Sequence, residues 1–209
     1  MKSLFILLIL GQMFSLECLS QANSLQMCLI EYGTVKGEEV KNLQENEFVS
    51  YLEKKNQMYL NCIKGKLAPK FNAVDIGGNA VNLYEFKKII VVNFWFYGCV
   101  GCQKEFPALL KLYKNYQRDD ILFLSITSDS KPQTQWVVSN RGHTADHIIA
   151  EDKRIAKLYG IRYPTTFLID KNHLIKRGWI GIPNDATNGV NIFYDDVSEA
   201  LNNLLKQNK

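Results

Sequence analysis

The hydrophobic pattern from residue 67 onward alternates between two periods. Residues 88–96 form an almost unbroken apolar run rich in β-branched side chains, which predicts a strand covered on both faces. Residues 101–118 carry apolar positions at helical spacing among charged ones, which predicts an amphipathic helix. The same reasoning predicts strands at 120–127, 147–150, 165–170 and 174–180, and helices at 132–140, 155–159 and 195–207. This alternation predicts one α/β domain over residues 67–209, with the last two strands as a hairpin at the sheet edge.

The segment before this domain has a different pattern. Residues 23–66 contain no proline and carry apolar side chains at roughly helical spacing, so we expect a helical N-terminal extension. The break between its two helices is predicted near residues 33–37. Cys28 and Cys62 lie on opposite sides of that break, where an antiparallel helix pair would bring them together. We therefore predict a Cys28–Cys62 disulfide, with two free buried thiols as the alternative.

The first residues have the composition of a secretory signal peptide. Lys2 is followed by an apolar run at 4–10, and Ser20 and Ala22 form a small-x-small cleavage site, which predicts a signal peptide at residues 1–22. A membrane anchor is the alternative, but polar residues interrupt the run well short of the ~20 residues that span a bilayer. We expect an exported, periplasmic protein without a membrane span in the mature chain.

Composition and charge narrow the class of protein further. The chain has 209 residues, of which 46% are hydrophobic and 22% charged, so it is not a disordered or low-complexity protein. Its net charge of +4 is spread along the chain rather than gathered into a basic stripe. The sequence therefore gives no indication of nucleic-acid binding.

Two cysteines stand where the first predicted core strand meets its helix. The two-residue spacing of Cys99 and Cys102 places both sulfurs in one helical turn, with Cys99 at the helix N-terminus. Backbone N–H groups and the helix dipole stabilise an anion there, so we predict Cys99 as the attacking thiolate and Cys102 as the resolving thiol. A structural disulfide and half of a metal site are the alternatives. No metal is predicted, because His143 and His147 are four apart without clear helical geometry.

Two stretches of the sequence resemble a known family. Residues 93–107 read Asn-Phe-Trp-Phe-Tyr-Gly-Cys-Val-Gly-Cys-Gln-Lys-Glu-Phe-Pro, and residues 163–170 read Tyr-Pro-Thr-Thr-Phe-Leu-Ile-Asp. In this order and spacing they resemble the exported thioredoxin-like proteins of the TlpA and ResA group, over about residues 65–181. The resemblance implies a thioredoxin fold with a central insertion. It also implies that Pro164 is a cis proline facing the cysteines, and that the backbone of Tyr163 pairs with an extended substrate segment.

The resemblance suggests further site residues and also shows departures. Glu105 matches the acidic residue that this group places near its cysteines, which implies that Glu105 accepts the proton of Cys102 from a surface position on the helix. A solvated carboxylate without a role is the alternative. Trp95 belongs either to the sheet core or, with Tyr163, to the substrate-docking groove. Gly98 replaces the tryptophan usual before the first cysteine, and Gly101 replaces a common proline, which predicts a looser site.

These observations predict an exported thiol-disulfide oxidoreductase. Its partners would be protein thiols and disulfides and a redox partner protein, and the exchange needs no cofactor. A peroxidase of the same fold is one alternative, but peroxiredoxins place a threonine three residues before the attacking cysteine, where this chain has Phe96. A copper-binding thiol module is another, although the cysteine spacing and the missing histidine disfavour it.

Overall fold

The computed structural model describes residues 25–33, 37–183 and 188–207. The predicted signal peptide at 1–22 lies outside these residues. The described chain divides into two compact units, one ending at Leu67 and the other beginning at Ala68. Within these ranges no helix is both long and apolar enough to cross a membrane.

The first unit is helical. It contains a π-helical turn, η1 (Leu29–Gly33), a short helix, α2 (Gly37–Val40), and a long helix, α3 (Glu45–Ile63). A capping box starts α3, because the Glu47 carboxylate accepts the backbone N–H of Gln44 at 2.8 Å. Near the other end of α3, Cys62 is bonded to Cys28, with the two Cα atoms 5.8 Å apart. The helical character predicted for this segment is therefore present in its described residues.

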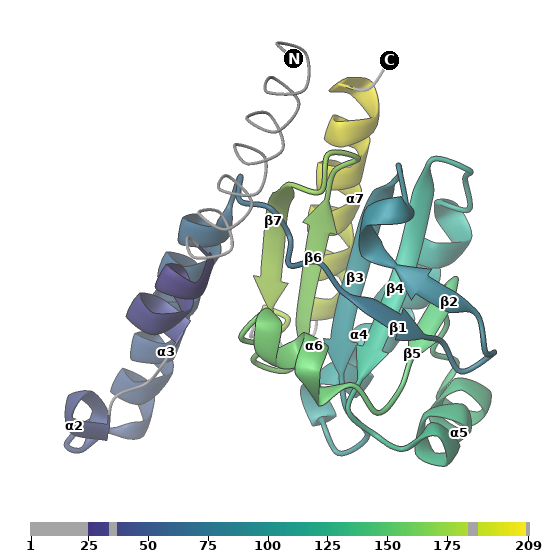
Figure 1. Cartoon of the computed structure of the whole chain (residues 1–209). Helices are drawn as coiled ribbons and strands as arrows, with labels where there is room; N and C mark the ends of the chain where they lie inside the picture. The colour runs from purple at the N-terminus through teal and green to yellow at the C-terminus, as the bar shows by residue number, and fades with distance from the viewer. Residues whose placement is uncertain (1–24, 34–36, 184–187, 208–209) are drawn as a thin grey trace, which may run out of the picture. The chain divides into compact units, whose positions relative to one another are not determined.

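The second unit is built on a five-stranded sheet in the order β5-β4-β3-β6-β7 (Figure 1). Its strands are β3 (Ile89–Trp95), β4 (Ile121–Thr127), β5 (His147–Ile149), β6 (Thr165–Ile169) and β7 (Ile175–Ile180). β3 runs parallel to β4 and antiparallel to β6, and β7 closes one edge antiparallel to β6. Every side chain of β3 and β4 is buried, as expected for strands covered on both faces.

Four helices accompany this sheet: α4 (Val100–Asn115), α5 (Lys131–Arg141), α6 (Lys153–Leu158) and α7 (Gly189–Gln207). α4 and α7 pack against each other and share a core with Val91 and Trp95 of β3. Because side chains alternate along a strand, Asn93 points toward the same face of the sheet. A polar residue of the central strand is thereby directed at the helix that begins beside the cysteines.

Two features of this unit differ from the sequence-based expectation. A small hairpin, β1 (Asn72–Val74) and β2 (Ala80–Asn82), followed by the turn η2 (Leu83–Glu85), was not predicted, because three-residue strands are too short to show a period. α7 begins at Gly189 rather than at 195. Its first residues have low helix propensity, but burial of Phe193 in the core favours the helix there.

Candidate active site

The two cysteines of the CxxC segment lie where β3 gives way to α4. Cys99 is the N-cap residue of α4, and Cys102 lies in its first turn. The backbone N–H of Cys102 donates to Cys99 Sγ at 3.0 Å, so the sulfur occupies the position of the side-chain oxygen that usually caps a helix. The two residues form a disulfide with Cα atoms 5.2 Å apart. The junction between strand and helix thus brings both sulfurs into one turn.

The two sulfurs are not equivalent. Cys99 keeps 7% of its surface exposed and Cys102 only 1%. The residues on either side of the cap, Tyr97 and Val100, are clearly exposed. Cys99 is therefore the cysteine nearer to solvent, and in the reduced protein the N–H groups at the start of α4 would stabilise its thiolate form.

Pro164 and Tyr163 lie beside this turn. The Tyr163–Pro164 peptide bond is cis. A Cβ atom added at Gly101 would stand 3.2 Å from Pro164 Cδ, so the absence of a side chain at 101 lets the proline ring approach the first turn of α4 closely. The half-buried Tyr163 ring packs edge-on against Phe96, with ring centroids 5.1 Å apart. Both residues named by the resemblance therefore flank the cysteines.

Glu105 is fully buried, which corrects the expectation of a surface position. Its Oε2 accepts a hydrogen bond from Asn93 Nδ2 at 3.3 Å, and its Oε1 has no partner among the described residues. Burial raises the pKa of the Glu105 carboxyl to about 8, because the charged form loses its water, and the Asn93 hydrogen bond opposes that rise. Asn93 Nδ2 also donates to Thr166 Oγ1 at 2.9 Å, across the β3–β6 pair. The site thus contains a buried carboxyl group one helical turn after Cys102, with only one of its two oxygens hydrogen-bonded among the described residues.

Trp95 belongs to the sheet core, the first of the two positions considered for it. The side chain is fully buried, and its Nε1 donates to Ser125 Oγ at 2.6 Å. The exposed aromatic residues near the cysteines are instead Tyr97 and Trp136, whose rings meet edge-on with centroids 5.7 Å apart. No local pattern in the sequence marks Trp136, because only the packing of α5 brings it to Tyr97.

The structure does not bring the two histidines together. His143, in the segment after α5, is buried with Nε2 2.6 Å from Ser125 Oγ. His147, the first residue of β5, lies with Nδ1 2.8 Å from Asp75 Oδ2. Throughout the described ranges, no three His, Cys, Asp or Glu side chains are grouped as metal ligands would be.

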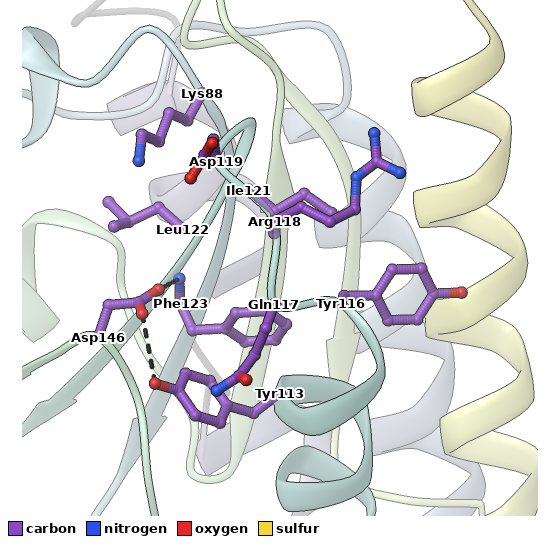
Figure 2. A pocket seen from close by; sticks show the side chains of 10 residues that line it. All are labelled: Lys88, Tyr113, Tyr116, Gln117, Arg118, Asp119, Ile121, Leu122, Phe123 and Asp146. Atoms are coloured by element: carbon purple, nitrogen blue, oxygen red, sulfur yellow. Dashed lines mark hydrogen bonds between the residues drawn. The ribbon is translucent and has the colours of Figure 1, made fainter.

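A cavity of about 460 Å³ lies beside the first residues of β4 (Figure 2). Its lining includes Lys88, which precedes β3, and Ile121 and Leu122, which begin β4, whereas Cys99 follows the other end of β3. Figure 2 shows Tyr113 directed at Asp146 across this cavity, with a hydroxyl-to-carboxylate distance of 3.4 Å. No residue of the CxxC turn contributes to its lining.

Comparison with known proteins identifies the family. Residues 64–177, more than half of the chain, match the AhpC/TSA family. The chain belongs to the AhpC/TSA family. Relatives of this family member include the thiol-disulfide oxidoreductase ResA of Bacillus cereus, which is 34% identical over 131 residues, covering 60% of this chain and 72% of the relative. ResA of Geobacillus thermodenitrificans is 31% identical over 116 residues, covering 54% of this chain and 67% of the relative.

Solved structures agree with these relatives. A thiol:disulfide interchange protein from Bacteroides sp. superposes with a TM-score of 0.54 at 26% identity, covering 66% of this chain and 90% of that one. The thioredoxin domain of a thiol-disulfide oxidoreductase from Bacteroides vulgatus has the same fold, with a TM-score of 0.55 at 24% identity, covering 65% and 96%. The predicted thioredoxin fold is confirmed. This family member is a ResA-like thiol-disulfide oxidoreductase of the thioredoxin superfamily.

Proposed function

We propose that this oxidoreductase exchanges disulfides with protein substrates outside the cytoplasm, with Cys99 as the nucleophile and Cys102 as the resolving thiol. The observation that carries the proposal is the asymmetry of the pair. Cys99 caps α4 and keeps some exposure, whereas Cys102 lies inside the helix and is almost fully buried. A thiolate attacks best where it is both stabilised and accessible.

The exchange proceeds in two balanced steps. The Cys99 thiolate attacks one sulfur of a substrate disulfide, a bond forms between Cys99 Sγ and that sulfur, and the other substrate sulfur leaves as a thiolate. Cys102 then loses its proton and attacks Cys99 Sγ, which restores the Cys99–Cys102 disulfide and releases the second substrate thiolate. Two electrons pass from the enzyme dithiol to the substrate, and the reverse sequence oxidises a substrate dithiol.

Glu105 accepts the proton of Cys102 in this proposal. A carboxyl with the ordinary pKa of 4.5 is a poor base for a thiol whose unperturbed pKa is about 8.5. Burial raises the pKa of Glu105 to about 8, which is close to the pKa of a thiol. Proton transfer between Cys102 and Glu105 is therefore almost balanced in free energy. The position of Glu105, three residues after Cys102 on α4, supports this role.

The substrate segment docks beside Cys99 in this proposal. The backbone of Tyr163, next to Pro164, pairs with an extended stretch of the substrate. The resemblance to the TlpA and ResA group implies this pairing. Tyr97, two residues before Cys99, and Trp136, which packs against it, offer exposed aromatic surface near the capping turn. A second thiol-disulfide protein restores the starting oxidation state after each turnover, because the site itself exchanges only the two electrons of its own pair.

We propose export to the periplasm on two grounds. Residues 1–22 have the composition of a signal peptide. The Cys28–Cys62 pairing is typical of a protein that folds in an oxidising compartment. We further propose that residues 23–66 form an extension separate from the catalytic domain at 67–209.

The test compares a protein disulfide with hydrogen peroxide as oxidants of the reduced enzyme. Peroxide is the substrate of the alternative function, a peroxidase of the same fold. Phe96 disfavours that alternative, because it stands where peroxiredoxins carry threonine. We expect the reduced enzyme to cleave the disulfides of insulin and to lose its own two active-site thiols for each disulfide cleaved. The Cys99→Ser variant should be inactive. Faster oxidation by peroxide than by insulin would replace this proposal with a peroxidase.

A further inference from the structure

His143 belongs to a buried group with Trp95 and Ser125 that the proposed mechanism does not use. Only 2% of its surface is exposed, although it lies in an irregular segment between α5 and β5. Its ring packs against Phe106 of α4 and edge-on against Trp95 of β3, with centroid distances of 4.4 and 5.0 Å. Its Nε2 lies 2.6 Å from Ser125 Oγ of β4. Three elements therefore fix the orientation of this imidazole.

The hydrogen bonds of Ser125 bear on which imidazole nitrogen carries the proton. Trp95 Nε1 lies 2.6 Å from Ser125 Oγ and can only donate. The Ser125 hydroxyl proton is not used in that bond, and it remains available for the short contact with His143 Nε2. With that proton donated, Nε2 is the acceptor nitrogen and the one N–H of the neutral imidazole is on Nδ1. That nitrogen is buried and meets no partner in the part of the chain that the structure describes.

An unpaired acceptor borders the same space. Asn93, Ser125 and His143 together line a small cavity with room for about one water molecule. Asn93 Nδ2 is engaged with Glu105 and Thr166, whereas Asn93 Oδ1 is buried without a partner among the described residues. Asn93 and His143, each with one buried polar atom that lacks a partner among the described residues, therefore line the same water-sized cavity.

We propose that His143 is a positioning residue that donates its Nδ1–H to a water molecule in this cavity, which in turn donates to Asn93 Oδ1. These two hydrogen bonds through the water fix the Asn93 amide with Oδ1 toward the cavity and Nδ2 toward Glu105. The inference rests on the proposed role of Glu105 as the acid-base group of the site. His143 would thereby set the acidity of Glu105 without touching the reacting sulfurs.

The orientation of the amide matters because its two ends act oppositely on the carboxyl. An N–H from Asn93 favours the carboxylate and lowers the pKa of Glu105, whereas a carbonyl oxygen there would favour the protonated acid. The groups around Glu105 and His143 are Asn93 and Trp95 from β3, Ser125 from β4, Phe106 and the cysteines from α4, and Thr166 from β6. When the cysteines are joined, none of these neighbours is charged. Burial lowers the pKa of His143 to about 3, so the imidazole stays neutral across the range in which Glu105 titrates.

The test titrates Glu105 in the oxidised protein, where the active-site thiols cannot titrate. The ¹³C resonance of its carboxyl, identified by its absence in Glu105→Gln, gives the midpoint directly. His143→Asn keeps an N–H donor near the position of Nδ1, whereas His143→Gln reaches Ser125 but loses that donor. We expect the midpoint to stay within about 0.2 pH units in His143→Asn and to rise by about 0.5 to 1 unit in His143→Gln.

Two results would overturn the inference. One is the same midpoint in both His143 variants, since a purely structural histidine would not distinguish them. The other comes from the unmodified protein: long-range ¹H–¹⁵N spectra should show a neutral His143 with its proton on Nδ1 between about pH 5 and 9, and a proton on Nε2 would contradict the chain. Neither measurement depends on turnover, so a failure here is distinguishable from a failure of the proposed disulfide exchange.

Discussion

The two disulfides in the described part of the chain differ in position, and the difference suits them to different tasks. Cys28–Cys62 joins residues 34 apart in the helical unit, whereas Cys99–Cys102 joins residues 3 apart at the start of α4. Closing the longer loop removes far more freedom from the unfolded chain. Only the shorter disulfide combines a helix N-terminus, an N–H donor to sulfur and a buried acid on the same helix. The first is suited to stability and the second to exchange.

The largest expected difference between the two disulfides is in activity. Cys99→Ser should lower the rate of insulin disulfide reduction by about 10³-fold or more, because no nucleophile remains. The matched variant, Cys28→Ser with Cys62→Ser, should keep that rate within about twofold. A large loss of activity in the second variant would show that the helical disulfide takes part in exchange.

The acid beside the reactive disulfide should make stability depend on pH. Glu105 has a folded-state pKa of about 8 against an ordinary value of 4.5, so its contribution to stability is full below about 4.5 and is lost as the pH rises through 8. Urea unfolding of the oxidised protein should show this fall, amounting to about 5 kcal/mol at most. Glu105→Gln should flatten the slope between these pH values, and an unchanged slope would contradict the buried acid.

Of the two disulfides, Cys28–Cys62 should have the larger effect on stability. Removing Cys28–Cys62 should lower the free energy of unfolding of the helical unit by about 3 to 4 kcal/mol. Hydrogen exchange of the α3 backbone amides measures this loss, with Cys99→Ser/Cys102→Ser as the control that leaves α3 protected. Equal protection of α3 with and without Cys28–Cys62 would remove the stabilising role.

Local signals were sufficient for the main frame of the catalytic domain and for the cysteine pair. The apolar runs of β3 and β4 and the two-residue spacing of Cys99 and Cys102 are properties of short stretches, and each predicts its structure without knowledge of the rest of the chain. The β1–β2 hairpin was missed because its strands are only three residues long.

The parts of the site that sequence reasoning missed depend on long-range packing. Glu105 follows Cys102 by one turn and looks like a surface carboxylate, but α4 turns it toward Asn93 of β3. The sequence left Trp95 either in the core or in a docking groove, and its hydrogen bond to Ser125 lies in the core. His143 gave no signal as a buried residue, because its neighbours come from β3, β4 and α4. Burial and hydrogen-bond partners of this kind follow from the assembled fold.

The most direct test of the central claim traps the covalent intermediate. Cys102→Ser should leave Cys99 nucleophilic but unable to release its target, so mixed disulfides with protein partners should accumulate and disappear on reduction with dithiothreitol. Cys99→Ser should trap none, because Cys102 is almost fully buried inside α4. Adducts appearing equally with both substitutions, or with neither, would contradict the assignment of Cys99 as nucleophile and Cys102 as resolving thiol.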